Sequence, residues 1–168
     1  SSDLLGLVDR TYYLLNRFGL RYHTQSEVDV IRETLRTAVN AYCEEADSVM
    51  AQARELTHQA QQNTMDWLTP RYTSNTLEMD FDVKARDTMS LVRSLEVWDK
   101  AILEFAALEF NDTASIGQID TMRQRERRLF MTVSKLCLRT IGGFSKRRVN
   151  LAGGKDSEKK EAHAPTED

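Results

Sequence analysis

Apolar residues recur three and four positions apart over most of the chain, the spacing that gathers side chains on one face of an α-helix. A short first helix is predicted over residues 4–18, with Gly19 ending it. A third is predicted over residues 91–110. A fourth follows a cap at Thr113 or Ser115 and extends to Phe144.

The longest apolar pattern predicts a second helix from Ser26 to Trp67, uninterrupted by Pro or Gly and stopped by Pro70. The run from Ser26 to Asp29 resembles a capping box. Alanines in the apolar seam would let a partner helix approach closely. The seam consists of two interlocked series with a seven-residue repeat, Val28, Leu35, Tyr42, Val49, Leu56 and Val39, Ala46, Ala53, Ala60, Trp67.

Residues 75–83 have a period of two instead, which predicts a strand with one buried face. Its inward residues are Leu77, Met79, Phe81 and Val83. No other segment is a strand candidate, and a single strand leaves its backbone donors and acceptors unpaired. We therefore expect pairing with the same strand of a second subunit in a homodimer, with an unrecognised intrachain strand as the alternative.

Together these elements predict a mainly α fold, a four-helix domain with one long helix and a single β-strand paired across a dimer. The domain is expected over residues 1–151, with a helical half at 1–70 and a ribbon-helix-helix-like half at 75–150. Residues 152–168 lack periodicity and are predicted to be a disordered tail. Because the chain begins with Ser rather than Met, we expect it to be part of a longer protein.

Composition argues against several classes of protein. Cys43 and Cys137 are the only cysteines, and their apolar helical positions favour buried thiols in the reducing cytoplasm over a disulfide. No apolar stretch is long enough to span a bilayer, so no membrane partner is expected.

Catalytic motifs are absent from the sequence. It contains no Gly-rich phosphate loop, no cysteine pair at zinc spacing and no Gly-x-Ser-x-Gly, so we expect neither an enzyme nor a cofactor. Glu55 and His58 have the i, i+3 spacing of metal ligands in a helical bundle. A second Glu-x-x-His pair is missing, so no metal site is predicted.

Charge is unevenly distributed along a chain whose formal net charge is -3. Residues 1–119 contain 11 Lys or Arg and 19 Asp or Glu, whereas residues 120–150 contain 9 and 2. An external polyanion would relieve the repulsion along this basic helix. The residues predicted to contact nucleic acid are Arg123, Arg125, Arg128, Lys135, Arg139, Lys146, Arg147 and Arg148. A solvated face and docking onto an acidic protein surface are the alternatives, and ion pairs with the acidic N-terminal half would argue against nucleic acid.

The segments Met79–Val83, Leu91–Asp99 and Arg123–Leu129 together resemble AcaB-like proteins, regulators carried by integrating conjugative elements and conjugative plasmids. The resemblance covers residues 75–148 and lies in the order of parts. It implies sequence-specific DNA binding as a dimer and activation of genes on a mobile element. This chain departs from a DNA-reading ribbon because the outer face of the predicted strand carries three carboxylates, which phosphates would repel.

We therefore predict a cytoplasmic, dimeric, DNA-binding transcriptional regulator that contacts DNA through its arginine-rich helix. The alternative is a helical adaptor or small structural subunit of a larger assembly. Such a protein would dock through the alanine-rich seam of the long helix, and exposure of Val39, Ala46 and Ala53 in the isolated chain would favour this alternative.

Overall fold

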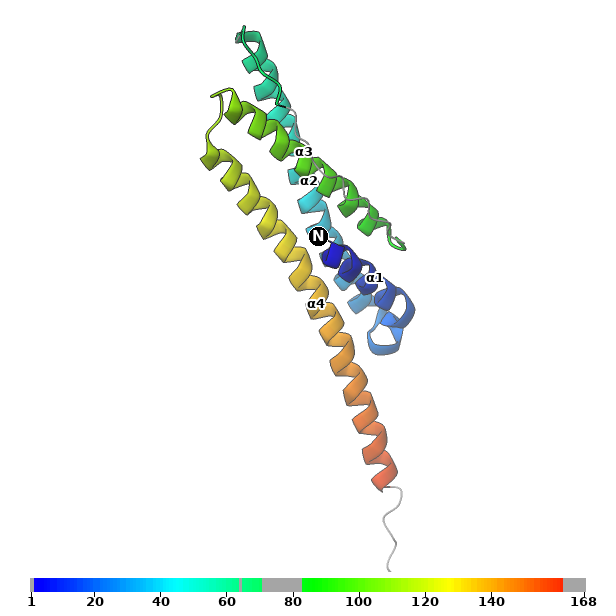
Figure 1. The fold of residues 1–168 in the computed structure, drawn as a ribbon. Coiled ribbons are helices and arrows are strands. Elements are labelled where there is room, and N and C mark those ends of the chain that lie inside the picture. The colour runs from blue at the N-terminus through cyan, green and yellow to red at the C-terminus, as the bar shows by residue number, and fades with distance from the viewer. Residues whose placement is uncertain (1, 64, 71–82, 162–168) are drawn as a thin grey trace, which may run out of the picture.

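The computed structural model describes residues 2–63, 65–70 and 83–161, which form four α-helices (Figure 1). These are α1 (Ser2–Tyr22), α2 (Gln25–Asn63), α3 (Arg86–Phe110) and α4 (Ile116–Glu161). The long helices α2 and α4 run side by side in opposite directions, and α4 extends beyond the other helices at its C-terminal end (Figure 1). Over the described ranges, no helix has the length and apolar character needed to cross a membrane.

The short helices α1 and α3 each cover one half of the α2·α4 pair (Figure 1). Thr57 of α2 donates a hydrogen bond to Glu104 of α3 at 3.0 Å, near one end of the molecule. Toward the other end, Arg32 of α2 donates to Asn16 of α1 at 2.7 Å. The protein therefore consists of two three-helix sections that share α2 and α4.

The apolar seam of α2 lies in the core, as its heptad spacing predicts. The buried members are Val28, Leu35, Val39, Tyr42, Ala46, Val49, Ala53 and Ala60, whereas Leu56 is half-buried. Trp67, predicted as the last seam position, is also half-buried but lies beyond the end of α2 at Asn63. Small alanine side chains allow close packing of helices at these positions. Because Val39, Ala46 and Ala53 are covered within the chain itself, the exposed seam that an adaptor would use is not present.

The strand-containing, ribbon-helix-helix-like fold predicted above is wrong, since the described part of the chain is all α and contains no strand. Val83 precedes α3 without belonging to a strand. The other predicted ribbon residues, Leu77, Met79 and Phe81, lie outside the described ranges. Helices α3 and α4 pack against α2 and α1, so their apolar faces are buried without a ribbon from a second subunit.

Several helix boundaries differ from their predictions: α2 ends at Asn63 rather than at Trp67, and α3 begins at Arg86 rather than at residue 91. Gly19 does not end α1 but lies buried within it, where a Cβ atom would stand 3.1 Å from Cγ2 of Val28. This glycine therefore serves the close approach of α1 and α2. Helix α2 starts before Ser26, because the amide of Glu27 donates to the hydroxyl of Thr24 at 3.2 Å and makes Thr24 the cap.

The C-terminal end of α4 also differs from its prediction. The helix passes through Gly142 and Gly143 and continues to Glu161. Residues 152–161, predicted to be part of a disordered tail, are helical, and residues 162–168 lie outside the described ranges.

Polar contacts join α1 to the beginning of α3. One carboxylate oxygen of Asp9 accepts hydrogen bonds from the amides of Lys84 and Ala85, at 3.0 and 2.9 Å, and from the hydroxyl of Thr88 at 3.1 Å. Nearby, the buried Tyr12 hydroxyl donates to Asp87. Burial and this carboxylate raise the pKa of Tyr12 far above its usual range, so the phenol stays protonated and remains a donor.

Candidate nucleic-acid interface

Helix α4 has one buried face and one basic face. Val133 and Cys137 are fully buried, and Met122 and Phe144 lie on the same side. Successive residues of a helix point about 100° apart, so residues at helical spacing lie along one face. The face opposite the buried residues therefore carries its side chains in a line along the helix axis. Four exposed cations occupy that line, which we call the basic stripe: Arg128, Lys135, Arg139 and Lys146. With a rise of about 1.5 Å per residue, the stripe is about 27 Å long.

The basic stripe faces away from the rest of the molecule. Helices α1, α2 and α3 all lie on one side of α4 (Figure 1). None of the described helices therefore covers the stripe, which is accessible to an extended partner along its whole length.

The eight residues predicted to contact nucleic acid are divided by the fold. The four members of the basic stripe have no carboxylate within 4.0 Å among the residues that the structure describes, and Arg123 is also exposed but lies off the stripe. Arg125 and Arg147 instead form ion pairs with α2, to Glu45 at 3.1 Å and to Glu27 at 3.2 Å. The side chain of Arg148 lies outside the described part. Ion pairs with the acidic half therefore account for two of the eight residues and leave the stripe untouched.

An acidic residue of α4 is directed into the helix bundle. The Tyr42 hydroxyl of α2 donates to Glu126 at 2.9 Å. Burial, and then the charge of Glu126, raises the pKa of Tyr42 far above its usual range, so the phenol remains a donor. Glu126 thus joins α4 to α2 and does not neutralise the basic stripe.

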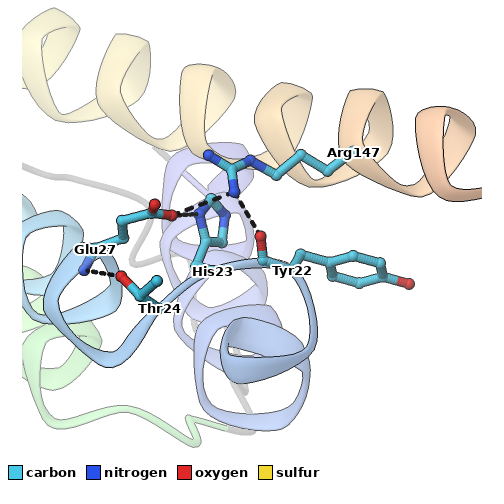
Figure 2. A network of polar contacts seen from close by, with 5 residues as sticks. All are labelled: Tyr22, His23, Thr24, Glu27 and Arg147. Atoms are coloured by element: carbon cyan, nitrogen blue, oxygen red, sulfur yellow. Dashed lines mark hydrogen bonds and ion pairs between the residues drawn. The ribbon is translucent and has the colours of Figure 1, made fainter.

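Arg147 belongs to a network that joins the α1–α2 turn to α4 (Figure 2). It donates to the backbone carbonyl of Tyr22 and pairs with Glu27, whose same oxygen lies 2.9 Å from Nδ1 of His23. No prediction from the sequence included this contact of His23. The signal that could have found it is the capping box formed by Thr24 and Glu27.

Glu27→Gln is expected to reduce the loss in the free energy of unfolding that the protein shows as pH falls. The hydrogen bond from His23, and then the charge of Arg147, lowers the pKa of Glu27 below the usual value of a glutamate. A carboxylate with a lowered folded-state pKa stabilises the fold above its unfolded pKa, and this stabilisation is lost as pH falls through the folded value. Urea denaturation between pH 6 and about pH 3 should show wild type losing more free energy of unfolding than the variant.

Glu33→Gln is the matched control for this experiment, because Glu33 is exposed on α2 and has no ion pair within the described ranges. Its profile should follow that of wild type. Parallel profiles for all three proteins would contradict the assigned role of Glu27.

The described residues offer little for metal binding or nucleophilic chemistry. No group of three or more His, Cys, Asp or Glu could hold a metal ion within the ranges searched. Glu55 and His58 are exposed and contact Gln59 and Gln62 of their own helix. Both cysteines are free thiols, and burial raises the pKa of Cys43 and of Cys137, which keeps them protonated and poor nucleophiles.

Comparisons of this chain with family models, curated proteins and solved structures found no match. The resemblance to AcaB-like proteins therefore stays a prediction.

Proposed function

We propose that this protein binds DNA through the basic stripe of α4 and acts as a transcriptional regulator rather than as an enzyme. The observation that supports this most is the line of four exposed cations, none with a carboxylate within 4.0 Å among the described side chains. Their positive charge is concentrated on one helix of a chain with a formal net charge of -3.

Phosphate contacts would provide most of the affinity. Each Lys or Arg that neutralises a phosphate releases condensed counterions, and the logarithm of affinity falls by about 0.9 per contact for each tenfold rise in salt. Four contacts predict that affinity falls roughly 100-fold between about 50 and 200 mM salt. Arg128 and Arg139 additionally have the planar guanidinium that can recognise guanine in the major groove.

The cellular role is proposed from the resemblance alone, as activation of genes on a mobile genetic element. A homodimer also stays a proposal, but no longer one based on strand pairing. Light scattering of the free protein and of its DNA complex measures the mass directly, and a single subunit in both would contradict the dimer.

Fluorescence anisotropy with a labelled DNA duplex tests the proposed function. We expect binding at micromolar protein in about 50 mM salt and the steep loss given above at about 200 mM. A duplex RNA of the same sequence distinguishes the two nucleic acids, and polyglutamate tests docking onto an acidic protein surface. The proposal fails if DNA does not bind at micromolar protein, if its affinity is independent of salt, or if polyglutamate binds more tightly than DNA.

A further inference from the structure

A groove of about 340 Å³ lies between α1 and the C-terminal half of α4. Its apolar lining comes from both helices, and its polar residues are Arg10, Arg21 and Ser145. Lys146 of the basic stripe follows Ser145 and so points about 100° away from it. The groove is therefore a separate surface, with a volume in the range of small-molecule sites, about 300 to 1,000 Å³.

Apolar surface in this groove remains partly open in the folded chain. Leu14 and Phe18 of α1 and Ile141 of α4 are only half-buried. Phe144 is buried and forms a T-shaped ring pair with Tyr22, with ring centroids 6.1 Å apart. The network of Figure 2 holds the neighbouring α1–α2 turn against α4, so this end of the groove is preorganised.

Positive charge borders the same apolar surface. Arg10 and Arg21 are exposed and have no carboxylate within 4.0 Å in the described ranges. The guanidinium carbon of Arg21 lies 5.8 Å from the centroid of the Phe18 ring, so a cation–π contact keeps its charge at the groove. Guanidinium groups bind carboxylates through paired, charge-assisted hydrogen bonds. A neutral ligand cannot accept such bonds, because it lacks the anionic oxygens.

We propose that this groove binds a small amphipathic anion. The apolar chain or ring of the ligand lies on Leu14, Phe18 and Ile141, and its carboxylate contacts Arg10 or Arg21. The ligand class is thus a carboxylate with an apolar body, of a size that a 340 Å³ groove accommodates. This site does not depend on DNA binding, because none of its residues belongs to the basic stripe.

Calorimetric titration of the full chain with decanoate tests the site, using concentrations below micelle formation. Decanol and decyltrimethylammonium are the matched probes, with the same alkyl chain and a neutral or a cationic head. We expect saturable binding of one decanoate, at least about tenfold tighter than decanol, and no binding of the cation. Absence of saturable decanoate binding, or equal affinity for decanol, overturns the proposal.

Paired variants localise the ligand. Arg10→Gln with Arg21→Gln should weaken decanoate to the affinity of decanol, whereas Ser145→Phe should fill the groove and weaken both. The controls are Arg54→Gln with Arg93→Gln, and Ser48→Phe, all at exposed positions outside the groove. Thermal melting confirms that each variant folds. The proposal is overturned if substitution of the control arginines weakens decanoate binding as much as substitution of the groove arginines.

A variant of the basic stripe separates this site from the proposed function. Arg128→Gln with Lys135→Gln should leave decanoate affinity unchanged, because both residues lie outside the groove. Decanoate binding without DNA binding would reject the function and retain the groove, and the reverse result would reject only the groove.

Discussion

Removing the basic stripe should weaken binding to a DNA duplex by at least about 100-fold at about 50 mM salt and remove most of its salt dependence. The variant combines Arg128→Gln, Lys135→Gln, Arg139→Gln and Lys146→Gln. All four side chains are exposed and have no ion-pair partner in the described part, so the substitutions remove charge without breaking an ion pair given by the structure. Anisotropy titrations at two salt concentrations measure both effects.

A control with the same change of charge shows whether position matters. Arg54→Gln, Arg86→Gln, Arg93→Gln and Lys100→Gln remove four exposed cations from α2 and α3. This variant should retain most of the affinity for DNA and most of the salt dependence. Equal losses in both variants would attribute binding to overall charge and remove the basic stripe as an interface.

Trp98→Ala should destabilise the fold by about 3 to 5 kcal/mol, the usual cost of removing a buried aromatic side chain. Trp98 is 1% exposed, and its ring lies 6.0 Å from that of Tyr42, so the substitution leaves a cavity between α3 and α2. Urea denaturation measures the difference in the free energy of unfolding. Leu103→Ala, at an exposed position of the same helix, is the control and should cost under about 0.5 kcal/mol.

Trp98→Phe should cost clearly less than Trp98→Ala. The indole Nε1 of Trp98 is buried and has no hydrogen-bond partner among the residues that the structure describes, and a buried N–H in that state is unfavourable. Phenylalanine removes this group while filling much of the space, so relief of the unpaired donor offsets part of the lost packing. Equal costs for the two variants would indicate that the indole ring as a whole is required there.

The α2 seam was predictable because its spacing is regular over many turns and neither Pro nor Gly interrupts it. The end of α1 was not predictable from sequence, because Gly19 is explained by its approach to Val28 on another helix rather than by local turn geometry. The strand prediction relied on a short alternation at residues 75–83. It led to the wrong fold because sequence alone did not reveal that α2 and α1 cover the helices that follow.

The basic stripe followed from helical geometry alone, since residues opposite a buried face are exposed wherever the helix packs. The ion pairs of Arg125 and Arg147 did not follow from helical geometry. Their partners Glu45 and Glu27 lie far away in the sequence and reach the arginines only because α2 packs on α4. The groove was equally inaccessible to sequence analysis. Its two walls come from α1 and α4, and no local pattern relates Phe18 to Ile141.

Two helices common to both halves of the molecule impose a cooperative architecture. If either end were to melt, the opposite end would lose support from the same two long helices, so partial unfolding confined to one half is disfavoured. A ligand that binds only the folded chain at α1 should therefore raise the free energy of unfolding of both halves together. The described helices should therefore unfold together as one cooperative unit.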